Sequence, residues 1–419
     1  MRRALDYSRL PPPTVPLAFL LAAPWFGVAA GGVAAWHGAA VVASRWNAPA
    51  LAAVHLVTLG FLTMTMAGSL LQMMPAVAGL PLRGTSRLAA WSCPLLGAGA
   101  ALLAAAFLSG QAPLFALAGT LLFIAFAQLL ACLLPTLWQR TRAAAAAAHI
   151  AAGMRGAVAA LLACIVAGLL LAGWLAGGPA VPVLPLVDAH AALGLVGWVV
   201  PLVMAVSFQV IPMFQATDPF PPLAARRLVP LVLSALAGWI AGRWLDAPWR
   251  TVPALAGAAL VTAYASLAAA LLLRRERTRT AAGTRYWLLG LAALAGAAWL
   301  FAWPGEPSDT RTALTGVAFL LGCAMSVVNG MLYRIVPFLV WHHVRASLPP
   351  GVAAPKFAEL IAPERLRIQC RWHAAAVAMA LGACLAPPLA SSAGLLLAFA
   401  CLRLGLELAA PVVRHRSSL

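Results

Sequence analysis

Three stretches of the chain resemble one another and decide the fold. They read HLVTLGFLTMTMAGSLLQMMP over 55–75, HAALGLVGWVVPLVMAVSFQVIP over 190–212 and TGVAFLLGCAMSVVNGMLYRIVP over 315–337. When they are aligned on their final prolines, all three share one glycine, at Gly60, Gly197 and Gly322. Each also carries a polar residue three positions before its proline, at Gln72, Gln209 and Arg334. The chain therefore contains an internal repeat of three copies.

A second small residue follows each shared glycine after eight positions, as Gly68, Ala205 and Gly330. Eight residues are about two turns of an α-helix, so both small residues of a copy lie on one helix face. Small residues at such spacing allow membrane helices to approach one another closely. We expect the three repeated segments to pack tightly through these faces.

The composition indicates a protein that lies in a lipid bilayer. Of the 419 residues 63% are apolar and 9% are charged, and the mean hydropathy is +0.93. Soluble domains carry about a quarter charged residues. The uniform apolar runs exclude a single-anchor protein and a β-barrel, whose strands would alternate. The net charge of +18 comes from arginines between the apolar runs. These arginines indicate how the chain is oriented in the membrane, and they do not indicate a nucleic-acid partner.

Twelve apolar segments are long enough to span a bilayer. They cover about 17–43, 50–78, 88–109, 113–137, 154–177, 187–213, 227–244, 252–273, 286–303, 312–341, 373–389 and 392–412. The repeats fall on the second, sixth and tenth of these segments. We therefore predict one all-α polytopic membrane domain over 1–419, built from three pseudo-equivalent arcs of four helices at about 1–137, 138–273 and 274–419.

Basic residues concentrate in alternate connections, which predicts that both chain ends lie in the cytoplasm. Arg2 and Arg3 precede the first apolar run, which we interpret as a retained helix because it is long enough to span. The longest connection, at about 344–371, is also predicted to lie inside. Its sequence KFAELIAPERLRIQ is typical of an amphipathic helix at the membrane interface.

A period of four helices in twelve resembles subunit I of haem-copper oxidases and nitric oxide reductases. The chain is also similar, over almost its whole length, to the NnrS proteins, smaller twelve-span relatives that contain haem and copper and are linked to nitrogen-oxide metabolism. The resemblance implies an oxidase-like arrangement of helices in a bacterial inner membrane. It also implies a bound haem b and a respiratory or electron-transfer partner subunit.

Three histidines are candidate ligands for haem or a metal ion. His55 lies in the second span five residues before Gly60, where the related proteins place an axial haem ligand. His190 begins the sixth span and His37 ends the first, so helix direction brings all three to the outer third of the bilayer. The alternatives are an interfacial position for His37 beside Trp36 and a hydrogen-bonding pair of His190 with Asp188.

Two departures from the oxidase pattern limit the chemistry. The seventh span, 227–244, contains no histidine, so the paired copper ligands are missing. The apolar run of the tenth span has none either, and His342 and His343 follow at its inner end, too far along the helix to reach the outer histidines. We therefore predict no oxygen-reductase activity and name no catalytic residue.

Two further groups of side chains are candidates for function. Arg403 and Glu407 lie four residues apart in the last span, where they form either a structural pair or part of a proton or ion pathway. Methionines of the repeats, such as Met66 and Met73, are alternative ligands for Cu(I), a soft ion. The seven cysteines contain no CxxC pair, which excludes a zinc ribbon.

Two hypotheses follow from the sequence. The first is a haem- or metal-binding membrane protein of oxidase-like fold, acting in respiratory or nitrogen-oxide metabolism, with His55 as a ligand and His190 or His37 as its partner. The second is a twelve-span transporter of a small molecule or metal ion. Transporters of that size often divide into two halves of six helices. The period of four spans favours the first hypothesis.

Overall fold

The computed structural model describes residues 11–74, 86–139, 147–275, 282–349, 352, 355 and 357–415. Within these residues the secondary structure is entirely helical. Eleven of the described helices are long and apolar enough to cross a membrane. The chain is therefore a polytopic helical membrane protein. Pro75 and the arginines at 2, 3, 83, 140, 142, 277 and 279 lie outside the described residues.

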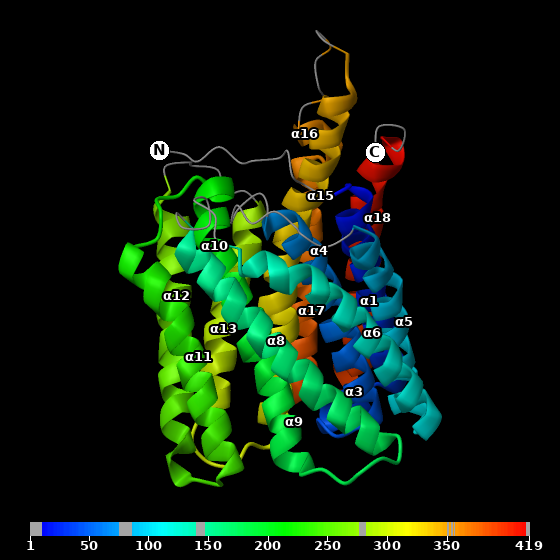
Figure 1. Ribbon diagram of the computed structural model, residues 1–419, viewed down its shortest axis with the longest axis vertical. Helices are drawn as coiled ribbons and strands as arrows, with labels where there is room; N and C mark the ends of the chain where they lie inside the picture. The colour runs from blue at the N-terminus through cyan, green and yellow to red at the C-terminus, as the bar shows by residue number, and fades with distance from the viewer. Residues whose placement is uncertain are drawn as a thin grey trace.

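Long helices run through the molecule side by side (Figure 1). The uninterrupted ones are α1 Thr14–His37, α5 Ser86–Ser109, α6 Ala112–Leu137, α8 Ala148–Leu175, α11 Pro222–Trp244, α12 Thr251–Arg274, α13 Ala282–Ala302, α17 Pro363–Leu385 and α18 Ala390–Arg414. Short helices α2 Ala40–Ala43 and α16 Phe357–Leu360 lie in connections. Most boundaries fall within a few residues of the predicted ones, because long apolar runs end at arginines, prolines and glycines.

Several predicted boundaries were wrong by six residues or more. The first span ends at His37 and not at 43, because Gly38 has a φ of 53°, outside the helical region. The predicted connection 344–371 is shorter, because α15 continues to Ser347 and α17 already begins at Pro363. A hydropathy window detects the apolar part of a helix and misses its polar flanks. The charged first half of α17 also explains why this helix is absent from the eleven apolar ones.

Each repeated segment forms a helix with a π-helical stretch in its first half. The three helices are α3 Ala48–His55, η1 Leu56–Thr63 and α4 Met64–Met73; α9 Val183–Ala192, η3 Leu193–Val199 and α10 Val200–Gln215; and α14 Asp309–Val317, η5 Ala318–Met325 and α15 Ser326–Ser347. In the alignment of the repeats the π-helical stretches all begin at the same position. Since π-helical turns are rare, this shared irregularity confirms that the repeat is present in the structure as well as in the sequence.

The small residues of each repeat pack against another helix, as predicted. A Cβ atom added at Gly197 would lie 2.7 Å from the Ala160 Cβ on α8, and one at Gly322 would lie 2.8 Å from the Ala293 Cβ on α13. One at Gly60 would overlap the Phe26 side chain on α1. In all three copies the neighbour is the long helix that comes first in the corresponding predicted arc.

The three repeat helices also share a cavity of about 80 Å³. Equivalent residues of each copy line it: Thr65, Met66, Ser69 and Met73 from α4; Leu202, Val203, Val206 and Val210 from α10; and Val327, Val328, Met331 and Ile335 from α15. Four aligned positions therefore face the same space in every copy. The three helices gather around one axis and present the same face to it.

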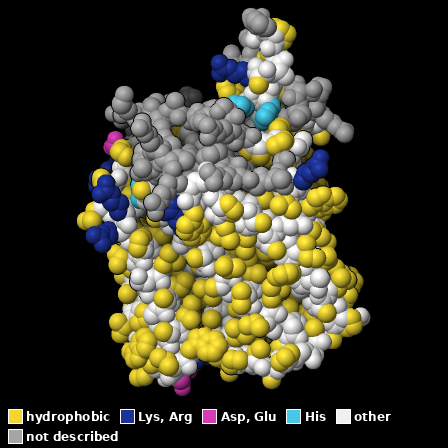
Figure 2. Space-filling model, in the orientation of Figure 1, with side chains coloured by type: hydrophobic (Ala, Val, Ile, Leu, Met, Phe, Trp, Pro, Cys, Tyr) yellow, Lys and Arg dark blue, Asp and Glu magenta, His cyan; other side chains and the backbone are white. Residues whose placement is uncertain are grey.

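The two ends of the molecule differ in charge. Helix α1 begins and α18 ends at the upper end in Figure 1, which we call the terminal end, while α3 and α9 lie toward the opposite, far end. Figure 2 shows arginine side chains mainly toward the terminal end, above a wide band of apolar side chains. This distribution suits a bilayer around the band.

Candidate functional site

His55 and His190 lie next to each other near the far end of the molecule. His55 is the last residue of α3, and His190 lies on α9, each just before its π-helical stretch. The centroids of their imidazole rings are 6.3 Å apart, and the ring planes make an angle of 14°. The structure therefore brings together two of the three predicted ligands, from equivalent ends of two repeat helices.

Main-chain carbonyl groups fix the orientation of both rings. The Nδ1 atom of His55 lies 2.8 Å from the carbonyl oxygen of Leu51. The Nδ1 atom of His190 lies 3.0 Å from the carbonyl oxygen of Cys164, on α8. A carbonyl can only accept a hydrogen bond, so each Nδ1 carries the hydrogen and each Nε2 keeps its lone pair. This is the arrangement in which metal-binding histidines are usually held.

The walls around the pair are apolar and closely fitted. The ring of Phe107, on α5, lies 5.0 Å from the ring of His55 and packs edge-on against Phe115. Gly168, on α8, faces the His190 ring, where an added Cβ would lie 2.9 Å from the ring atom Cε1. Only glycine leaves the imidazole this position. The Cys164 thiol lies 3.5 Å from Nδ1 of His190.

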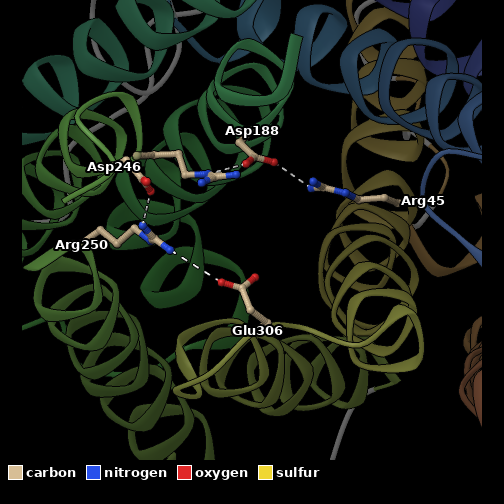
Figure 3. A network of polar contacts seen from close by, with 6 residues as sticks. Arg45, Asp188, Asp246, Arg250 and Glu306 are labelled. Carbon is tan, nitrogen blue, oxygen red and sulfur yellow. Dashed lines mark hydrogen bonds and ion pairs between the residues drawn. The ribbon is translucent and has the colours of Figure 1, made fainter. Parts of the chain in front are cut away.

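Asp188 connects three segments beside the pair. Its carboxylate accepts hydrogen bonds from Arg45 at 2.8 Å and from Arg243 at 2.7 Å, and its side chain is only 8% exposed (Figure 3). The proposed alternative, a hydrogen-bonding pair of Asp188 with His190, is not formed among the described residues: Nδ1 of His190 bonds to the carbonyl of Cys164, and Asp188 binds arginines from distant parts of the chain. Asp188 holds α9 against α11 and against the segment that leads into α3.

A second, exposed group of charges lies near Asp188. Arg250 pairs with Asp246 at 2.8 Å and approaches Glu306 at 3.8 Å (Figure 3). Both of these acidic side chains are more than four-fifths exposed. Exposed pairs of this kind contribute little to stability.

The remaining sequence candidates lie away from the histidine pair. His37 is exposed at the end of α1. Gln72 lies 17 residues after His55, roughly 25 Å along the helix, and neither of its side-chain polar atoms has a partner among the described residues. Gln209 and Arg334 occupy the equivalent, distant positions of their repeats, and Met66 and Met73 face the central cavity. The structure therefore does not unite these residues with the pair.

Sequence reasoning missed a polar cluster around His373. This histidine is 1% exposed on α17, and its two ring nitrogens lie 2.8 Å from Ser326 Oγ and 3.1 Å from Asn329 Nδ2. The predicted pair of Arg403 with Glu407 is confirmed at 2.5 Å, and the Tyr333 hydroxyl also donates to Glu407. Ser326 and Asn329 are 44 or more positions away from His373 in the sequence, so no local pattern pointed to this cluster.

The donor atoms at the pair suit a cofactor that brings ligands of its own. Within the described residues, histidine, cysteine and acidic side chains form no group of three that could hold a metal ion. A bare metal ion generally needs three or four protein ligands, whereas haem iron takes four nitrogens from its macrocycle and needs only one or two axial side chains.

No protein-family model matches the chain, and no curated protein matches it either.

Proposed function

We propose that the chain is a haem-binding protein of a bacterial inner membrane, with His55 and His190 as the two axial ligands of one haem b. The observation that carries this proposal is the near-parallel pair of imidazoles on two repeat helices. A metal ion bonded to two imidazole nitrogens at about 2.0 Å each would hold the two ring centres roughly 6 Å apart. The observed separation of 6.3 Å fits this expectation.

The residues around the pair support the same proposal. Leu51 and Cys164 would keep both Nε2 atoms available through their carbonyl groups. Phe107 would supply an apolar wall that excludes water and influences the redox potential of the iron. A haem held by these two histidines would supply electron-transfer chemistry, and because both histidines would bind the iron, no ligand position would remain for oxygen. An electron-transfer or respiratory subunit is the partner class that such a site requires.

The proposal includes the architecture inferred from the sequence. In it α17 is a twelfth span, the helices form three arcs of four, and the terminal end lies in the cytoplasm. The shared register of η1, η3 and η5 and the common lining of the central cavity support the period of four. The absence of histidine from α11 still argues against the copper site of an oxidase. We therefore propose a role in respiratory or nitrogen-oxide metabolism without oxygen reduction.

The test is the absorption spectrum of the full chain purified from haem-replete cells. We expect a Soret band that shifts or disappears in His55→Ala and in His190→Ala. His37→Ala is the matched control, and it should keep the spectrum because His37 is exposed at the end of α1. A colourless preparation, or two variants with unchanged spectra, would overturn the proposal.

The transporter hypothesis has weaker support. It predicts two halves of six helices, whereas the π-helical stretches recur after every fourth predicted span. Cu(I) bound by methionines is likewise weaker, because Met66 and Met73 face a cavity whose other lining residues supply mostly aliphatic side chains. Metal analysis of the purified protein would detect bound copper directly.

A further inference from the structure

Ionisable side chains lie buried between α13, α15, α17 and α18, in a part of the molecule that the proposed haem site does not use. They are Glu407, Tyr333, Tyr286 and His373. Ionisable groups inside membrane proteins are rare and usually serve transport or proton transfer. We propose that these four residues form a proton path from the terminal end into the middle of the helix bundle.

The path begins at a pocket of about 110 Å³ near the terminal end. Its lining includes Glu407 together with the charged side chains of Glu359, Arg365 and Arg414. Glu407 is 7% exposed, and this pocket is where its side chain meets the surface. A proton carried by water in the pocket therefore reaches a carboxylate at the edge of the membrane-spanning part of α18.

The Glu407 carboxylate connects the pocket to the interior. One of its oxygens lies 2.5 Å from Arg403, and the other accepts a hydrogen bond from the Tyr333 hydroxyl. Arg403 balances the charge of the carboxylate, which makes a buried acid tolerable in this position. Tyr333 can pass a proton because its hydroxyl both donates and accepts.

Tyr286 continues the path toward His373. Its hydroxyl is buried and has no hydrogen-bond partner among the described residues, and its side chain packs on α15 at Gly330, three residues before Tyr333, where an added Cβ would lie 2.9 Å from the Tyr286 Cβ. Its ring lies 5.6 Å from the ring of His373. Leaving a buried hydroxyl without a partner is unfavourable. A water molecule bonded to this hydroxyl would remove that cost and would link Tyr333 to the deeper groups.

His373 ends the path with a defined donor and a defined acceptor. Asn329 donates through Nδ2 to Nδ1 of the ring, at 3.1 Å, so Nε2 carries the hydrogen and donates to Ser326 Oγ at 2.8 Å. Ser326 lies seven residues before Tyr333 on α15, roughly 10 Å deeper in the molecule. In the proposed path the ring takes up the arriving proton at Nδ1, in place of the hydrogen bond from Asn329, and the proton leaves again through the same groups. Every step moves a proton alone, so no oxidant or reductant is required.

Exchange at the histidine ring tests whether protons reach His373. The C2 hydrogen of an imidazole exchanges in D2O only when water and protons have access to the ring. The full chain in lipid nanodiscs is incubated in D2O, and the deuterium content of each histidine is measured by mass spectrometry of peptides. We expect His373 to exchange at a rate similar to that of exposed His37, although its side chain is buried. No measurable exchange at His373 would overturn the proposal.

Two variants test the route. Glu407→Gln preserves the size of the side chain and removes its charge, and it should slow exchange at His373 severalfold while leaving His37 unchanged. Tyr286→Phe removes only a hydroxyl that bonds to no other described residue, so the fold is expected to persist, and exchange at His373 should slow as well. If Glu407→Gln does not fold, the exchange rate of His373 in Tyr286→Phe is the test of the route. Unchanged exchange at His373 in the folded variants would contradict the route, whether or not the protein binds haem.

Discussion

Asp188 shows how a single side chain can position a functional group that it does not touch. It lies two residues before His190 and binds arginines 143 and 55 residues away in sequence. These two ion pairs fix the start of α9 relative to α11 and to the segment before α3. The distance between the two imidazoles therefore depends on a buried charge whose partners were not visible in the sequence.

We expect Asp188→Asn to lower the free energy of unfolding by about 1–3 kcal/mol, because two charge-assisted hydrogen bonds are weakened. The lower part of this range is favoured, since Arg45 is 41% exposed and water screens its pair. Thermal unfolding in detergent measures the change. Asp246→Asn, at an aspartate that is 85% exposed, is the matched control and should change stability by less than about 1 kcal/mol. Equal effects of the two substitutions would contradict the positioning role.

The repeat helices show which structural features are equivalent between the three copies. Each has its π-helical stretch at the same position and turns its small residues toward a neighbouring long helix. Gly68 faces α1, Gly153 of α8 faces Ala205, and Gly330 faces α13. Close contact without side chains in between is what holds such helices together in lipid, where the hydrophobic effect does not act between them.

Replacement of the shared glycines by alanine should therefore destabilise the protein in all three copies. We expect Gly60→Ala, Gly197→Ala and Gly322→Ala each to cost about 1–3 kcal/mol, the usual cost of overpacking. Gly32→Ala and Gly296→Ala are the controls, because an added Cβ at either position meets nothing within 4 Å. Thermal unfolding of the five variants compares the two groups. If the shared glycines tolerate alanine as well as the controls do, the close packing of the repeats is not important for stability.

At the level of the whole molecule, the charge distribution predicts the orientation in the membrane. Arg226, Arg227, Arg274, Arg285 and Arg345 belong to connections or helix ends that the topology assigns to the cytoplasm. The network of Asp188, Asp246 and Glu306 then lies on the outer side, near the histidine pair. Haem at this depth would exchange electrons with a partner on the outer side.

Labelling with a membrane-impermeant maleimide measures the orientation. The seven native cysteines are free and mostly buried, so they should react slowly. In intact spheroplasts we expect Glu306→Cys to be labelled, because this position is 92% exposed and lies at the far end. Ala346→Cys, exposed near the terminal end, should be labelled only after the membrane is opened. The reverse pattern would place the histidine pair on the cytoplasmic side.

The sequence predicted those features of the fold whose evidence lies within a single segment of the chain. Apolar runs located the helices, and the aligned glycines located the repeat that η1, η3 and η5 confirm. Helix direction placed His37, His55 and His190 at one depth, which allowed a shared site, but it did not predict which of these side chains meet. The partners of Asp188 and the cluster around His373 depend on pairs of residues 44 or more positions apart. Such pairs leave no local pattern, and so they were not predicted.

Electron paramagnetic resonance of the oxidised, purified protein tests the haem proposal most directly. Two axial imidazoles whose planes differ by only 14° should give a rhombic low-spin ferric signal, because parallel ring planes lift the degeneracy of the iron orbitals. We predict this signal for the native chain and its loss in His190→Ala. A high-spin signal in the native chain, or no haem signal at all, would contradict ligation of one iron by His55 and His190.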